Sequence, residues 1–165
     1  MPIEEIEPKI KVTIRTAVED DLDKFKGIVS ERKIKLFRER FKKNRMCFIA
    51  LDHKKIAYFG WISFDDEYET IFQIMVRVKD KEAYWFDCHT IPEYRRYGLH
   101  SAITAKALIY LKDKGCKKVL TPVMKDNIYS RKAFEKVGFK EKRMVTLIKL
   151  FNFKHYIYRD FKGKL

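Results

Sequence analysis

The sequence predicts a mixed α/β fold (α+β) in which helices flank a central, mostly antiparallel sheet. Short segments with alternating apolar and polar residues, typical of strands, are interspersed with segments whose apolar residues recur every three or four positions, typical of helices. Their order is strand, two helices, three or four antiparallel strands, helix, strand, helix and two final strands. The chain has 165 residues, so we expect a single domain over residues 10–162, preceded by a polar leader over residues 1–9.

The first half of the chain contains most of the expected sheet. Alternation places strands at residues 11–16, 46–51, 56–64, 71–78 and 84–91. A helix opens after Ala17, where three acidic residues suit the positive end of the helix dipole. A second, very basic helix follows Ser30. The second and third strands read as a hairpin, and an acidic turn is expected at residues 65–70.

The second half begins with the best-defined helix, which starts at Leu99. Its apolar residues fall largely on one face, two lysines lie in its last turn, and Gly115 follows as the residue that ends it. A strand is expected at residues 119–124 and a short helix, capped by Asn127, at residues 128–137. Two last strands are expected at residues 144–150 and 155–158.

Charge restricts the classes of partner. The net charge is +14, and residues 31–45 carry eight basic against two acidic side chains, as do residues 140–165. Such a surface attracts the phosphates of a coenzyme, an acidic substrate, nucleic acid or an anionic membrane, although a solvated lysine-rich surface explains it equally well. Residues 149–159 interleave basic and aromatic side chains, but an ordinary pair of strands accounts for that pattern better than nucleic-acid binding.

The number and spacing of the cysteines, together with the lack of a recognisable targeting sequence, predict a cytoplasmic protein. The three cysteines are odd in number and have no metal-ligand spacing, as expected for reduced thiols. No apolar run is long enough to span a bilayer, and the acidic N-terminus does not read as a signal peptide. The acidic residues 65–67 lack a calcium-loop pattern, so no metal is expected.

The stretch from Pro92 to Gly98 connects an expected strand to the helix at Leu99 and contains the pair Arg95 and Arg96. The first turn of a helix has free N–H groups and the positive end of the helix dipole, and together these favour an anion. We therefore expect this loop to hold the pyrophosphate of a coenzyme.

This loop, Asn127 and the segment 133–139, which ends in Gly-Phe, resemble in their order and spacing the GNAT superfamily of acyl-CoA N-acyltransferases. The resemblance covers about residues 10–150. It implies a GNAT-like fold, acetyl-CoA as co-substrate, and transfer of the acetyl group to an amine.

The pyrophosphate loop of that family reads Gln or Arg, two residues, Gly, one residue, then Gly or Ala. Arg95 and Gly98 match, whereas His100 departs from the last position and would either crowd the turn or contact a phosphate itself. The resemblance implies coenzyme contacts from the strand before the loop, the loop itself and the last helix. These residues are Cys88, Thr90, Arg95, Arg96, Tyr97, Gly98, Leu99, His100, Ser101, Asn127, Ser130 and Phe134.

A second departure concerns the acid that protonates the leaving thiolate. The family often has tyrosine where this chain has Phe134, which has no proton to give. Tyr129, Ser130 and Tyr97 are the candidate replacements, with Tyr129 as our choice. Alternatively the thiolate leaves without an acid, since thiols have pKa values of about 8.5, or the protein is not a catalyst.

The amine must also lose a proton, which requires a general base. Alternation puts Asp87 and His89 on one face of their strand and Cys88 and Thr90 on the other. His89 is the first candidate because an unshifted histidine titrates at about 6.5. The alternative role for His89 is that of a hydrogen-bonded strand residue beside the coenzyme. Asp87 could serve as the base, orient His89, or form a structural ion pair. We expect Cys88 to be a buried strand residue and not a nucleophile.

These observations predict an N-acetyltransferase that transfers an acetyl group from acetyl-CoA to a primary amine of a small molecule, amino sugar or peptide by direct attack. The basic surface favours an acidic or phosphorylated acceptor. The alternative is a non-catalytic acyl-CoA-binding or regulatory module, and nucleic-acid binding on the same fold ranks third. A homodimer is left open.

Overall fold

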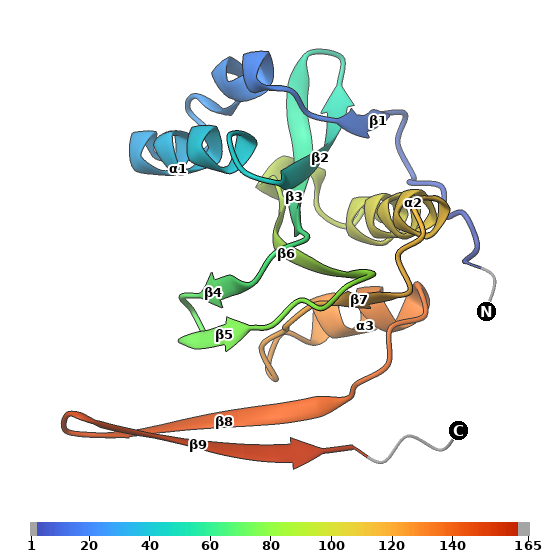
Figure 1. Ribbon diagram of the computed structural model, residues 1–165. Helices are drawn as coiled ribbons and strands as arrows, with labels where there is room; N and C mark the ends of the chain where they lie inside the picture. The colour runs from blue at the N-terminus through green and yellow to red at the C-terminus, as the bar shows by residue number, and fades with distance from the viewer. Residues whose placement is uncertain (1–2, 162–165) are drawn as a thin grey trace.

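The computed structural model describes residues 3–161 and has a five-stranded sheet at its centre, in the order β1-β2-β3-β6-β7 (Figure 1). Its strands are Thr13–Thr16 (β1), Arg45–Asp52 (β2), Lys55–Ser63 (β3), Glu82–Thr90 (β6) and Lys118–Leu120 (β7). Only β6 and β7 are parallel. The expected mixed, mostly antiparallel sheet is confirmed. Residues 1–2 of the expected leader and residue 162 of the expected domain lie outside the described residues.

Two small sheets accompany the central one. Glu67–Glu69 (β4) pairs with Ile74–Val76 (β5), so the expected acidic turn contains a short strand and the strand expected at residues 71–78 is reduced to its middle. Arg143–Leu150 (β8) pairs with Phe153–Asp160 (β9) in a hairpin that lies apart from the central sheet (Figure 1). Alternation therefore located both final strands without showing which sheet they join.

Within residues 3–161, five helical segments connect the strands. They are η1 (Glu19–Phe25), α1 (Glu31–Phe41), η2 (Pro92–Tyr94), α2 (Leu99–Asp113) and α3 (Ile128–Lys136). The Ser30 hydroxyl caps α1 by accepting from the Lys33 N–H (3.3 Å), and the Asn127 side chain caps α3 by accepting from the Ser130 N–H (3.1 Å). The first expected helix is a 3-10 helix, because its amides bond to carbonyls three residues back, as Asp21 does to Val18 (2.9 Å).

The hydrophobic core has two parts, one on each face of the central sheet. Phe59 and Trp61 of β3 point toward η1 and α1, where Phe25, Phe37 and Phe59 make edge contacts with ring centroids 5.1–5.5 Å apart. The intervening Tyr58 of β3 points to the other face, where α2 and Phe134 of α3 pack. This alternation of β3 between two apolar layers is why nearly all of its residues are buried.

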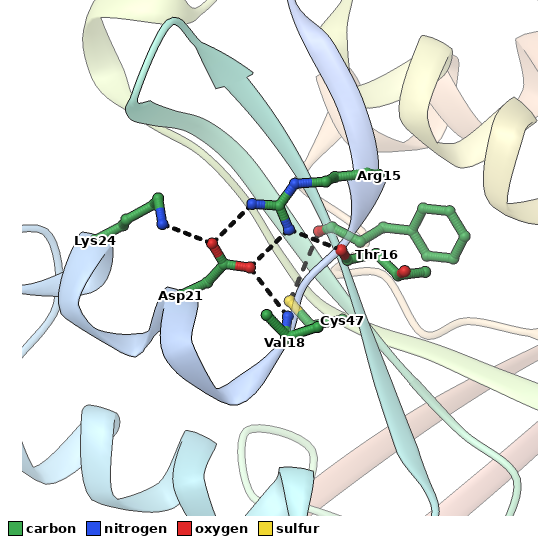
Figure 2. A network of polar contacts seen from close by, with 7 residues as sticks. Arg15, Thr16, Val18, Asp21, Lys24 and Cys47 are labelled. Atoms are coloured by element: carbon green, nitrogen blue, oxygen red, sulfur yellow. Dashed lines mark hydrogen bonds and ion pairs between the residues drawn. The ribbon is translucent and has the colours of Figure 1, made fainter.

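Asp21 of η1 is the centre of a polar network that connects η1 to Arg15 of β1 (Figure 2). Its carboxylate is only 2% exposed and accepts two hydrogen bonds from the Arg15 guanidinium (2.6 and 2.7 Å). The carboxylate also accepts hydrogen bonds from Lys24 Nζ (2.8 Å) and from the Val18 N–H (3.0 Å). The hydrogen bonds from Arg15 hold the pKa of this carboxyl far below its ordinary value of 3.8.

Replacing Asp21 with Asn should lower the free energy of unfolding at pH 7 by about 3 kcal/mol, because Arg15 loses its charged partner while remaining partly buried. The pKa of Asp21 is lower in the folded than in the unfolded chain, so its stabilisation is complete above about pH 4 and is lost as the pH falls below that. Urea unfolding at pH 7 and pH 3 checks both statements.

Asp23→Asn is the matched control, since the Asp23–Lys26 ion pair is solvent-exposed on both sides and should contribute nothing measurable. Equal losses for the two variants, or a difference between wild type and Asp21→Asn that persists undiminished at pH 3, would contradict the prediction.

Candidate functional site

The loop between β6 and α2 is fixed at its start and turned sharply at its end. The Ile91 N–H donates to the Ala57 carbonyl of β3 (3.0 Å), and the Tyr94 hydroxyl donates to Asp52 Oδ2 (2.9 Å). Arg96 and Gly98 then take left-handed φ values of 69° and 78°. Gly98 adopts this conformation without steric penalty, and the helix begins at the next residue.

The first turn of α2 presents free amides at this point. The Ala102 N–H makes the first intrahelical bond, to the Gly98 carbonyl (3.1 Å), which leaves the amides of Leu99, His100 and Ser101 without an intrahelical acceptor. Arg95 and Arg96 lie beside them with exposed side chains. Free amides, the positive end of the helix dipole and two guanidinium groups make this turn suitable for a diphosphate.

The N-terminal segment contacts the same loop. The Lys9 N–H donates to the Tyr97 carbonyl (2.8 Å), and the side chains of Ile10 and Val12 pack on the core beneath α2. The part of the expected leader that the structure describes therefore supports the loop.

The strand before the loop, β6, contains a bulge. Phe59 of β3 stands opposite His89 and Trp61 opposite Phe86, so that Asp87 and Cys88 together face Gly60. Asp87 has a φ of 48°. Gly60 is required here, because a Cβ on it would lie 2.7 Å from the Trp85 ring.

The bulge changes which face each residue occupies. Phe86 and Asp87 both contact Arg40 of α1, so they lie on the same face of the sheet. Cys88 packs on the opposite face, and His89 returns to the first face, where it lies on Phe59. Asp87 and His89 thus share a face as expected, although strict alternation would have placed Asp87 with Trp85.

One edge of β6 is free over the same residues. β7 pairs with β6 only from Glu82 to Tyr84, and beyond that point no other strand within residues 3–161 pairs with β6 on this side. The backbone groups of residues 85–90 there can pair with an extended chain that carries amides. This free edge leads directly to the free amides of α2.

Asp87 forms two ion pairs with the basic helix α1. Lys33 Nζ lies 2.8 Å from Oδ1 and an Arg40 nitrogen lies 2.6 Å from Oδ2. The Arg40 guanidinium also stacks over the Phe86 ring, 4.8 Å from its centre. Because both carboxylate oxygens accept from cations, the geometry favours the structural ion pair over the general base.

Sequence reasoning did not connect Lys33 and Arg40 with the site. Their spacing of seven residues was the available sequence signal, because it places both side chains on one face of a helix. The sequence alone does not show which acidic residue this face contacts.

His89 is half-buried and stacks on Phe59, with ring centroids 5.5 Å apart. Burial lowers the pKa of His89 below its ordinary value of 6.5, and the positive charges of Lys33 and Arg95 act in the same direction. Asp87 opposes them only weakly. The imidazole is therefore neutral at neutral pH and is able to accept a proton.

Cys88 is partly buried beneath the bulge, and desolvation of its thiol raises the pKa to about 12. A thiol with that pKa is protonated at neutral pH and is a poor nucleophile. Cys88 is therefore a partly buried strand residue and less buried than expected. Thr90, two residues on, stands opposite Tyr58.

His100 turns inward from the loop. Its Nδ1 shares a hydrogen bond with the Tyr58 hydroxyl (2.8 Å), and its ring meets the edge of Phe134 with centroids 4.7 Å apart. Burial lowers the pKa of His100 to about 4, so the ring is uncharged. The expectation that this side chain crowds the turn or contacts a phosphate is therefore corrected: only its backbone amide faces the loop. Sequence reasoning missed Tyr58, which reads as an ordinary strand residue.

The remaining predicted residues lie on α3, in the first turn of α2 and in the loop before α2. Phe134 is buried against His100 and Phe139. The Ser101 hydroxyl donates to the Ala133 carbonyl (3.4 Å) and so connects α2 to α3. Tyr129 is 89% exposed and Tyr97 is 40% exposed, so both hydroxyls are accessible to solvent.

No three His, Cys, Asp or Glu side chains within the described part of the chain are grouped so as to hold a metal ion. Over residues 3–161, no helix is long and apolar enough to cross a membrane.

A model of the acetyltransferase (GNAT) family matches residues 14–139, which is most of the chain. The chain therefore belongs to this family, and the resemblance seen in the loop, Asn127 and Gly138-Phe139 is confirmed. A comparison with curated protein sequences gives no match.

Solved structures show the same fold. The aminoglycoside N-acetyltransferase AAC(6')-Iy in complex with CoA superposes with a TM-score of 0.65 at 18% identity, over 84% of this chain and 98% of that one. AAC(6')-Ih from Acinetobacter baumannii superposes with a TM-score of 0.61 at 20% identity, over 86% of this chain and 100% of that one. A transcriptional regulator from Bacillus halodurans C-125 superposes with a TM-score of 0.60 at 23% identity, over 79% of this chain and 93% of that one.

Proposed function

We propose that this protein is an N-acetyltransferase that transfers the acetyl group of acetyl-CoA to a primary amine by direct attack. The observation that carries the proposal is the continuity of two binding features: the free edge of β6 leads into the free amides of Leu99, His100 and Ser101. A pantetheine arm has amides that suit the strand edge, and the diphosphate suits the helix turn. Family membership supports both assignments.

In the proposed reaction the amine nitrogen attacks the thioester carbonyl, and a backbone N–H from residues 88–90 stabilises the oxyanion. His89, uncharged at neutral pH, accepts the proton that the amine loses. Collapse of the intermediate breaks the carbon–sulfur bond and gives the amide and the CoA thiolate. Tyr129 is the proposed donor of a proton to the thiolate, since Phe134 has none to give.

The acceptor class rests on the site and on the comparison. AAC(6')-Iy and AAC(6')-Ih, both aminoglycoside acetyltransferases, share the fold, which supports an amino sugar as one acceptor class beside small-molecule and peptide amines. The net charge of +14 favours an acceptor that also carries an acidic or phosphate group. Lys33 and Arg40 together add only one net positive charge to this attraction, because both are paired with the single carboxylate of Asp87.

Release of the CoA thiol, measured with a thiol-reactive dye, tests the proposal. The purified protein should release CoA from acetyl-CoA only when an amine is added, and the amide product should gain the mass of one acetyl group. The amine panel should include amino sugars, polyamines, peptides and phosphorylated amines. Tight CoA binding without release for any of them would contradict catalysis.

That outcome would favour the second candidate, a non-catalytic acyl-CoA-binding or regulatory module. Two observations support it: Phe134 replaces the family's usual hydroxyl, and a protein described as a transcriptional regulator shares the fold. The two functions differ in turnover and not in CoA affinity, so calorimetric binding and CoA release separate them.

We further propose a second copy of the chain as a partner, by way of the β8–β9 hairpin. Its side chains Leu150, Phe151 and Phe153 are 65%, 95% and 81% exposed, which is unusual for large apolar residues on one segment. Light scattering after gel filtration gives the mass in solution, and a monomer at all concentrations would reject this partner.

A further inference from the structure

The Tyr58–His100 hydrogen bond joins the centre of the sheet to the first turn of α2. Tyr58 lies in the middle of β3 and is fully buried, while His100 is the second residue of the helix. Their atoms are 2.8 Å apart, and the bond spans 42 positions of the sequence. A tyrosine that is held by the sheet on both sides is a rigid anchor for a helix end.

One further contact restricts the imidazole. Phe134 of α3 meets the ring edge-on with centroids 4.7 Å apart. The preceding residue, Leu99, is only 1% exposed, which holds the start of the helix against the core. The Nε2 atom of His100 is buried without a partner among the described residues. The ring is thus oriented by a single hydrogen bond, and Tyr58 is what fixes it.

The charge state of the ring determines which role it can have. Burial keeps the imidazole neutral at any pH above about 5, so it adds no positive charge that would attract a phosphate. Its polar contact is directed away from the loop. Its effect on an anion in the loop is therefore exerted through the position of the helix backbone.

We propose that Tyr58 and His100 are positioning residues that set the first turn of α2, so that the amides of Leu99, His100 and Ser101 converge on the coenzyme diphosphate. This inference rests on the proposed function, because it assumes that the coenzyme lies at that turn. The departure at His100 and the one at Phe134 are then a single feature, since the two rings pack on each other and both hold the helix in place.

The test measures the dissociation constant of CoA by calorimetry and the KM and kcat for acetyl-CoA. Tyr58→Phe and His100→Ala should each weaken CoA binding and raise KM about tenfold, while kcat changes less than twofold, because chemistry occurs at β6 and not at this turn. The double variant should lose clearly less than the sum of the two single losses, since both single variants remove the same hydrogen bond.

Two controls separate positioning from loss of stability. Tyr84→Phe removes a comparable buried hydroxyl, which donates to Glu69 (2.8 Å) from the same sheet, and should lower the melting temperature without changing CoA affinity. His100→Asn retains a polar atom close to the position of Nδ1 and should regain much of the affinity lost in His100→Ala.

Unchanged CoA affinity in Tyr58→Phe, an equal loss in Tyr84→Phe, or additive losses in the double variant would each overturn the inference. Failure of the wild type to bind CoA at all would instead reject the proposed function, so the two failures are distinguishable.

Discussion

Replacing Gly98 with Val should weaken CoA binding about 100-fold. Gly98 holds a φ of 78°, a conformation that costs a non-glycine residue about 1–2 kcal/mol and a β-branched residue more. The loop is expected to relieve this strain by rotating, which moves the first amides of α2 away from the diphosphate. Loss of one or two hydrogen bonds to a charged group, each worth about 1.5–3 kcal/mol, gives this magnitude.

Gly115→Val is a closely matched control at the other end of the same helix. Gly115 has a φ of 82°, and a Cβ added at either glycine meets no atom within 4 Å. Both variants should therefore lose similar stability in urea unfolding, while only Gly98→Val loses CoA affinity in calorimetry. Equal CoA affinity in the two variants would contradict the assignment of the loop.

Replacing His89 with Gln should lower kcat about 100-fold, the lower end of what a general base contributes. Glutamine keeps a polar side chain in the strand but does not accept the proton of the amine. His155→Gln, at an exposed histidine of β9, controls for loss of an imidazole elsewhere and should leave kcat unchanged. A similar kcat for His89→Gln and wild type would show that another group takes the proton.

The pH profile of kcat/KM gives an independent check on His89. A general base acts in its neutral form, so kcat/KM should fall as the pH drops through the pKa of His89 in the free enzyme, which burial places below 6.5. Lys33→Met removes a nearby positive charge that also lowers this pKa, so the midpoint should move to higher pH. A wild-type midpoint above 6.5, or no movement in Lys33→Met, would argue against His89.

Local chemistry was enough to predict where α1, α2 and α3 begin. Ser30 and Asn127 accept hydrogen bonds as helix caps, and Gly98 stands where the chain must turn into α2. Each of these depends on neighbours within a few residues, which a sequence displays directly.

The rest of the site depends on contacts between distant segments. The bulge at Asp87 and Cys88 requires Gly60 on another strand, and the orientation of His100 depends on Tyr58, which is 42 positions away. Alternation along β6 alone gives no sign of an extra residue in the strand. The hairpin β8–β9 was missed as a separate sheet for the same reason, because periodicity identifies strands without naming the partner of each.

The inward turn of His100 bears on how loops of this family are recognised. Glycine or alanine, which the family's pattern has at this position, needs little room between helix and sheet, and a phosphate at the proposed loop would need only the backbone amide. In this chain the larger side chain of His100 occupies the space between helix and sheet, and the buried hydroxyl of Tyr58 provides its hydrogen-bond partner. We expect family members with a large residue at the position of His100 to have a polar residue at the position of Tyr58 on β3.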